Sequence, residues 1–299
     1  MRQSYLGTQE IPLLVLAVSL FSSMAFSQTA QSLPNSQTEA SSGAPGSPAV
    51  PPGTRPQEAA IRRYRLEFAS FDNNVSNGLG HWWGGSLSLS GQPVKRLLVS
   101  GQAISQKRPG EVEQLFGMQT RILWADRFFT DLAFSGGGPD RPTAFFPRMR
   151  YDASVNLKIP GLPGFIFNGG LTRLYFGTPT NGRVRRGGIV YYWRRFVFQG
   201  NLFFNNIRPG NRKSKSVNGA VQYGQEGHYW IGLIGGGGRE AWQTLALTPQ
   251  DVEFTSYSSS LFLRKWLAPN YGVVASYAYS VKRAGYRIHG LEFKFFLDF

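Results

Sequence analysis

The sequence contains no cysteine and only three histidines among its 299 residues. Without cysteine the chain can form no disulfide, no thiolate metal site and no lipid-modified N-terminal cysteine. Charged residues make up 16% of the chain, well below the roughly 25% that is usual in soluble domains. No zinc-ligand pattern, P-loop, dinucleotide-binding fingerprint or G-x-S-x-G motif is present. The sequence therefore predicts no catalytic residue, no metal and no cofactor.

In contrast to charged residues, glycine and aromatic residues are abundant in the chain. The chain has 36 glycines, 14% aromatic residues and a net charge of +15. Its mean hydropathy of −0.23 is low for membrane helices but normal for transmembrane strands, because alternate residues of such strands are polar. A large positive charge often indicates nucleic-acid binding, but the basic residues are scattered and no RNA- or DNA-binding motif accompanies them. We therefore expect no nucleic-acid partner.

The N-terminal segment is typical of an exported protein. Residues 1–27 predict a secretory signal peptide, with an apolar run from Ile11 to Phe26 that is short for a spanning helix. A retained membrane anchor is the alternative. Residues 28–60 are rich in Ser, Gln, Pro, Ala and Gly and show no apolar period, so we predict a disordered periplasmic linker, a possible tether for a periplasmic partner.

From residue 61 to residue 299, apolar and polar residues alternate as strands require. The clearest case is 148–159, where Met149 begins a series of apolar odd positions and Arg150 a series of polar even ones. Over the whole region the polar positions carry Gly, Ser, Asn, Gln and mixed charges. The solvent-exposed face of a soluble β-sandwich usually carries many Lys and Glu residues instead. The pattern therefore favours a barrel with a polar lumen.

Short and longer connections alternate along this region. The short ones, assigned to the periplasmic end, lie at 90–93, 124–127, 160–164, 193–195, 224–227 and 267–270, and the longer ones near 72–80, 106–112, 136–147, 177–183, 207–214, 238–252 and 282–285. They predict an all-β fold, a closed antiparallel transmembrane β-barrel of about 14 strands over 61–299. Twelve strands is the alternative, because some strands alternate poorly. In one of them Arg173 shares a face with Leu171 and Phe167, which requires a bulge or a different register.

Aromatic residues gather at the predicted strand ends, often as adjacent pairs. Examples are Trp82 with Trp83, Phe128 with Phe129, and the single Trp266. We interpret them as the girdles that sit at the two membrane interfaces of such barrels.

The last strand is apolar at every second position. Leu291, Phe293, Phe295, Leu297 and Phe299 share one face. This ending resembles the C-terminal signature strand of bacterial outer-membrane barrels. The resemblance implies that these five residues act as a membrane-insertion signal and that the barrel-assembly machinery is a partner during insertion.

A second resemblance lies just before this strand. The run Leu263-Arg264-Lys265-Trp266-Leu267-Ala268-Pro269-Asn270, with the Tyr-rich hairpin that follows it, is similar to the C-terminal part of YaiO-type outer-membrane barrels. That resemblance implies a location in the bacterial outer membrane, in a family found with envelope polysaccharide genes.

The polar positions define a predicted lumen of mixed charge. They are Arg63, Arg65, Glu67, Arg121, Asp131, Arg150, Asp152, Lys158, Glu292, Lys294 and Asp298. Because basic residues outnumber acidic ones in this set, we predict a passive pore for small polar or anionic solutes. The alternative is a non-conducting barrel that acts as a scaffold or docking protein in envelope or polysaccharide assembly. A lipid-modifying hydrolase is a third, weaker possibility, for which His81 and His289 are the available bases, expected near the outer end of the barrel seam.

The connections assigned to the outer end are rich in arginine and lysine. They include Lys107, Arg108, Arg183, Arg185, Arg186, Lys213, Lys215 and Lys282. Arginine and lysine bind phosphate well, so we expect outer-membrane lipid and lipopolysaccharide as partners at this level.

Overall fold

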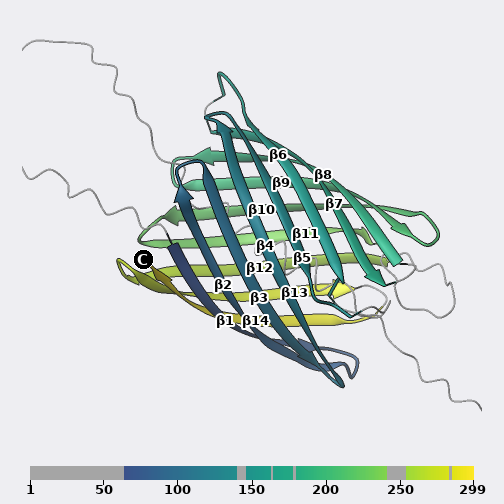
Figure 1. The fold of residues 1–299 in the computed structure, drawn as a ribbon. Coiled ribbons are helices and arrows are strands. Elements are labelled where there is room, and N and C mark those ends of the chain that lie inside the picture. Colours follow the sequence, from purple (N-terminus) through teal and green to yellow (C-terminus); the bar gives the residue numbers. More distant parts are fainter. Residues whose placement is uncertain (1–63, 140–145, 163, 178–179, 241–253, 283–284) are drawn as a thin grey trace, which may run out of the picture.

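The computed structural model describes residues 64–139, 146–162, 164–177, 180–240, 254–282 and 285–299. They form one closed antiparallel barrel of fourteen strands (Figure 1). The strands are β1 (Tyr64–Val75), β2 (Gly80–Val94), β3 (Leu97–Arg108), β4 (Glu111–Ala125), β5 (Phe128–Gly136), β6 (Met149–Lys158), β7 (Phe165–Gly177), β8 (Thr180–Trp193), β9 (Phe196–Arg208), β10 (Arg212–Gln225), β11 (Tyr229–Glu240), β12 (Phe254–Ala268), β13 (Tyr271–Lys282) and β14 (Arg287–Asp298). The predicted fourteen strands are confirmed and the twelve-strand alternative is wrong. The predicted signal peptide and linker, and Arg63, lie outside the described residues.

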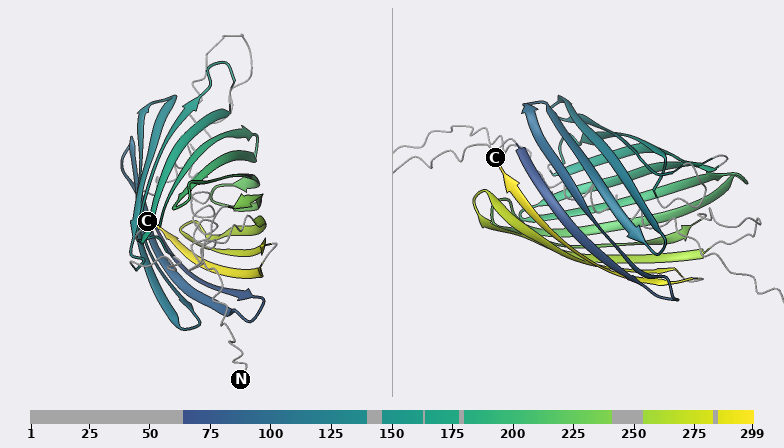
Figure 2. Two further views of the ribbon diagram at one scale, coloured as in Figure 1. Left: turned by 90° about the vertical axis from the view of Figure 1, so that its right-hand side faces the viewer. Right: turned by 60° about the horizontal axis from the view of Figure 1, so that its bottom comes forward.

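The first and last strands close the barrel. β1 pairs with β14 from Arg65 opposite Asp298 to Val75 opposite Ile288, and Figure 2 shows β14 lying beside β1 at the seam. The longest connections, between β5 and β6 and between β11 and β12, leave from the other end of the barrel. Bacterial barrels have short periplasmic turns and longer outer loops. We therefore assign the end at which β1 begins and β14 ends to the periplasm.

Side-chain alternation places one apolar face outward. On β14, Leu291, Phe293 and Phe295 are exposed on the outside, whereas Lys294 and Phe296 are buried on the inside. Each of the remaining thirteen strands also carries exposed apolar side chains on the outside. Together they form the surface that lipid covers in a membrane barrel. Across the described part of the chain, no helix has the length and hydropathy to cross a membrane.

Two details of the predicted connections are wrong. The turn expected at 90–93 lies at Lys95 and Arg96, because β2 continues to Val94 through an irregular register that accommodates Pro93. Most outer connections are also shorter than expected. For example, β3 reaches Arg108 and β4 begins at Glu111, so only two residues, 109 and 110, link them.

The unusual position of Arg173 needs neither a bulge nor a different register. The pairing of β7 with β6 and β8 is continuous from Phe165 to Tyr175. Arg173 therefore does face outward with Leu171 and Phe167, and all three side chains are exposed.

The aromatic pairs divide between the two faces. Trp83 and Phe128 lie outward as a girdle requires, but their neighbours Trp82 and Phe129 face inward and are buried. Trp266 is buried on the inside as well. The girdle prediction is therefore wrong for these three residues. The inward position of two of them could have been predicted from strand alternation. Trp266 is two residues from Arg264 and Phe129 is two residues from Asp131, so each shares a face with a charged residue of the lumen.

Candidate functional site: the lumen

The predicted lumen residues on the described strands occupy inward positions. Arg65 and Glu67 lie inside β1, Arg121 and Asp131 inside β4 and β5, Arg150, Asp152 and Lys158 inside β6, and Glu292, Lys294 and Asp298 inside β14. Two groups emerge, one at the periplasmic end near the seam and one on the wall formed by β4 to β8.

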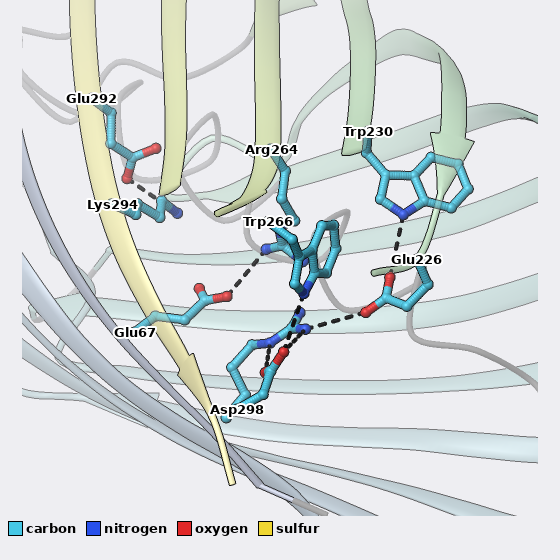
Figure 3. Close-up of polar contacts among 9 residues, drawn as sticks. Glu67, Glu226, Trp230, Arg264, Trp266, Glu292, Lys294 and Asp298 are labelled. Atoms are coloured by element: carbon cyan, nitrogen blue, oxygen red, sulfur yellow. Dashed lines mark hydrogen bonds and ion pairs between the residues drawn. The ribbon is translucent and has the colours of Figure 1, made fainter. Parts of the chain in front are cut away.

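The seam group is centred on Arg65, and Figure 3 labels its carboxylate partners Asp298 and Glu226. Its guanidinium binds both carboxylate oxygens of Asp298, with Nε to Oδ1 at 2.6 Å and Nη2 to Oδ2 at 3.0 Å. Nη2 also lies 3.1 Å from Glu226 Oε1 in the turn between β10 and β11. Three strands, β14, β13 and β12, separate β1 from β11 in the barrel wall. The contact from Arg65 to Glu226 is therefore made through the interior and not between neighbouring strands.

Two tryptophans complete the hydrogen bonding of these carboxylates. Trp266 Nε1 donates to Asp298 Oδ2 at 3.3 Å, and Trp230 Nε1 donates to Glu226 Oε2 at 3.2 Å. The Arg65 guanidinium also lies over the rings of Trp266 and Phe296, with Cζ 5.5 and 4.9 Å from the ring centroids. Such buried, multiply bonded charges fix side-chain positions, because an unpaired charge there is costly.

Two further ion pairs extend the seam group. Arg264 Nη2 donates to Glu67 Oε1 at 3.1 Å, and Lys294 Nζ lies 3.2 Å from Glu292 Oε1 (Figure 3). Ser276 also donates to Glu292. Sequence reasoning missed Arg264 and Glu226, because it assigned Glu226 to a turn and did not follow the inward parity of β12.

The opposite wall carries a network around Asp131. Arg121 Nε donates to Asp131 Oδ1 at 2.6 Å. The other carboxylate oxygen accepts from Asn156 at 2.9 Å and from Ser154 at 3.3 Å. Both oxygens of this acid are therefore occupied.

Arg186 on β8 adds a further cation beside this network. Arg150 binds Asp152 through two hydrogen bonds of 2.6 and 2.9 Å, and Thr172 also donates to Asp152. The charge of Arg186 interacts with those of Asp152 and Asp131, but its Nε is buried without a hydrogen-bond partner among the described residues. Three arginines thus face two aspartates here, an excess of one positive charge (3 − 2).

Apolar side chains line the periplasmic end of the lumen. We call them the periplasmic collar: Leu123, Phe129, Ile166, Val190, Tyr192, Val197, Trp230, Trp266, Val274 and Phe296. Trp230 contacts both halves of the collar, which extends from β4 to β14. Gly272 leaves room for the Phe296 ring of the collar, since a Cβ at position 272 would lie 2.5 Å from that ring and 2.2 Å from the Lys265 carbonyl oxygen.

The outer end of the lumen is also partly filled. Arg108 faces inward with its Cζ 4.0 Å from the centroid of the Trp82 ring, and Tyr286 packs against the same tryptophan. Phe146, which precedes β6, is buried and donates its backbone N–H to Glu113 at 2.9 Å. Two basic residues expected in outer connections, Arg108 and Lys282, are thus buried inside the barrel.

The two histidines do lie beside the seam, as expected. Asn74 on β1 is opposite both His81 and His289. His81 Nδ1 is 3.1 Å from Asp72 Oδ2, and His289 Nδ1 is 2.8 Å from the Tyr277 hydroxyl. In the described ranges, no three His, Asp or Glu side chains gather as a metal site would require.

A family model decides the broader assignment. The YaiO membrane beta barrel domain matches residues 64–243, which is more than half of the chain. The chain belongs to the YaiO membrane β-barrel family. The match confirms the resemblance noted from the sequence, although it covers other residues than the C-terminal segment that suggested it. A barrel of this family with an outward apolar face is an outer-membrane protein of bacteria.

Solved structures show the same architecture at low sequence identity. A barrel described as a bacterial polysaccharide outer membrane secretin has a TM-score of 0.53 at 8% identity, with 80% of this chain and 99% of that chain covered. One described as the CymD monoaromatic hydrocarbon channel has a TM-score of 0.50 at 8% identity, with 80% and 89% covered. No curated protein sequence matches this chain. At this identity, the similarity to the two solved structures is a similarity of fold alone.

Proposed function

We propose that this YaiO-family barrel is a passive pore that admits small polar solutes and prefers anions. The observation that carries the proposal is Arg186, a guanidinium on the inward wall whose positive charge is additional to the two arginine–aspartate pairs near it. It stands beside two aspartates that Arg121 and Arg150 already neutralise. An anion passing this wall meets a local excess of positive charge, which favours its entry.

The seam group has the opposite charge balance but offers little free charge. It holds three cations, Arg65, Arg264 and Lys294, against four carboxylates, Glu67, Glu226, Glu292 and Asp298. Each of these carboxylates binds a basic side chain within the group. The excess positive charge at Arg186 therefore has more influence on a passing ion than the paired charges of the seam group have.

The inward charges of the described residues are also net positive. The described inward side chains include the basic residues Arg65, Arg108, Arg121, Arg150, Lys158, Arg186, Arg212, Arg264, Lys282 and Lys294, and the acidic residues Glu67, Glu111, Glu113, Asp131, Asp152, Glu226, Glu292 and Asp298. Basic residues outnumber acidic ones in this set. Of the two barrels of similar fold, one is described as a secretin and the other as a channel, and the second description accords with a pore.

The periplasmic collar favours the second candidate, a non-conducting barrel that acts as a scaffold or docking protein. Apolar side chains that line part of a lumen oppose the passage of hydrated ions there. A lipid-modifying hydrolase has less support, because a hydrolase needs a nucleophile beside its base, and in the described structure His81 and His289 contact Asp72 and Tyr277 instead.

Planar-bilayer recording of the refolded barrel separates the two candidates. The pore proposal expects discrete, voltage-independent conductance steps from the wild-type protein. It also expects a larger conductance from Trp230→Ala, since that change removes the side chain that joins the two halves of the collar. If both proteins are folded and electrically silent, the pore proposal is wrong and the scaffold is favoured.

A further inference from the structure

Five basic side chains form a compact group on the outer wall of the barrel, away from the lumen. They are Arg173 on β7, Arg183 and Arg185 on β8, and Lys213 and Lys215 on β10, and all five are exposed on the outward face. We call this group the basic wall. It lies near the end of the barrel that is opposite the start of β1 and the end of β14. We assign that end to the outer leaflet.

Strand register places these residues in two adjacent rows. In the first row Arg173 is opposite Arg183, Arg183 opposite Asn206, and Asn206 opposite Lys213. In the second row Leu171 is opposite Arg185, Arg185 opposite Phe204, and Phe204 opposite Lys215. The basic wall is thus continuous over four neighbouring strands, β7 to β10.

Among the described residues, the basic wall has no acidic counterpart. None of its five members forms an ion pair with any described residue. Arg173 and Arg183 are directly opposite, an arrangement of like charges that destabilises a sheet unless a negative group lies between them. The wall therefore has the charge pattern of a site for an external anion.

The surroundings indicate an anion that is attached to a lipid. Phe204 lies between Arg185 and Lys215 and is exposed, with Lys215 Nζ 5.8 Å from its ring centroid. Directly below this row, Leu202 and Val217 are opposite each other and exposed on the same outward face. A phosphate held by the basic wall would thus have an apolar surface beneath it for acyl chains.

We propose that the basic wall binds the phosphate groups of lipopolysaccharide lipid A in the outer leaflet. Arginine and lysine side chains bind phosphate through charge-assisted hydrogen bonds. A basic side chain on the lipid face costs about 2–4 kcal/mol at the bilayer midplane but only about 0–1 near an interface, so the position at a strand end suits the headgroup level. This site is on the outside of the barrel and is independent of whether the lumen conducts.

The test compares lipid A binding by native mass spectrometry of the refolded full-length barrel in detergent. The variant replaces the basic wall with glutamine: Arg173→Gln, Arg183→Gln, Arg185→Gln, Lys213→Gln and Lys215→Gln. The matched control replaces five exposed basic residues of the periplasmic turns: Lys95→Gln, Arg96→Gln, Arg127→Gln, Arg194→Gln and Arg195→Gln. Both remove the same charge, so any general effect of net charge is equal in the two.

The basic-wall variant should bind bisphosphorylated lipid A at least tenfold more weakly than wild type, since each basic residue near a lipid surface contributes about a fivefold factor. The control should stay within about twofold of wild type. Dephosphorylated lipid A should bind all three proteins equally, and millimolar inorganic phosphate should not compete. Equal weakening in both variants, or competition by inorganic phosphate, would overturn the proposal.

A measurement on the wild-type protein covers the case in which the basic-wall variant does not fold. Raising the salt concentration should weaken binding of bisphosphorylated lipid A and leave binding of the dephosphorylated lipid unchanged, because salt screens exposed charges. The same salt response for both lipids would show that phosphate does not drive binding.

Discussion

Replacing Asp298 by alanine should lower the unfolding free energy of the barrel by about 3–5 kcal/mol, the cost of removing one partner from a buried ion pair. The Arg65 and Asp298 side chains are only 7% and 10% exposed. The change removes two hydrogen bonds from Arg65 and one from the Trp266 indole. Glu226 remains 3.1 Å from the guanidinium, so the loss should fall toward the lower part of that range.

The matched control is Asp72→Ala. Asp72 also faces a basic partner across neighbouring strands, at 3.1 Å from His81, but the two side chains are 53% and 61% exposed. Exposed pairs contribute about 0–1 kcal/mol. The assay is urea unfolding of protein refolded into lipid vesicles, followed by tryptophan fluorescence. If Asp298→Ala costs no more than Asp72→Ala, the seam group does not hold the periplasmic end together as argued here.

Three further outcomes follow from the fold. Heating should slow the migration of the native protein on gels, as expected of a closed barrel; a β-rich protein that stays soluble without detergent would contradict the fold. Gly272→Ala should destabilise the barrel by roughly 1–3 kcal/mol in the same urea assay, because the added methyl clashes with backbone and with Phe296, whereas Gly200→Ala, which meets no atom within 4 Å, should change the unfolding free energy by less than about 1 kcal/mol. Phe299→Arg should leave refolding in vesicles nearly unchanged, since a basic residue near an interface costs only about 0–1 kcal/mol, but should reduce assembly in cells if the final strand is read as an insertion signal; normal cellular assembly would count against that role.

Period-two alternation was enough to predict the fold. On β6 the odd positions are apolar and the even positions polar, and the strand follows that division; on β14 the apolar odd positions from Leu291 onward are enough, although Ile288 and Phe296 are apolar at even positions. Boundaries were less predictable. The dipeptide Gln92-Pro93 resembles a turn but lies inside β2, where an irregular register tolerates the missing N–H of proline.

The internal contacts could be predicted only in part. Parity alone placed Arg65 and Asp298 on the inward face, but the contact from Arg65 to Glu226 depends on barrel closure and on side-chain length. Arg186 was grouped with Arg183 and Arg185 as an outer basic cluster. Strand alternation instead sends Arg186 into the lumen and its two neighbours to the outer wall, which separates one expected surface into two different sites.

The central claim is an anion-preferring pore, and the reversal potential of the refolded barrel in a KCl gradient tests it most directly. The wild-type protein should show a reversal potential of the sign set by chloride. Arg186→Glu should move that potential toward the cation-selective side, because it changes the local balance from one positive charge in excess to one negative (3 − 2 to 2 − 3). Cation selectivity in the wild-type protein, or an unchanged potential in Arg186→Glu, would contradict the account.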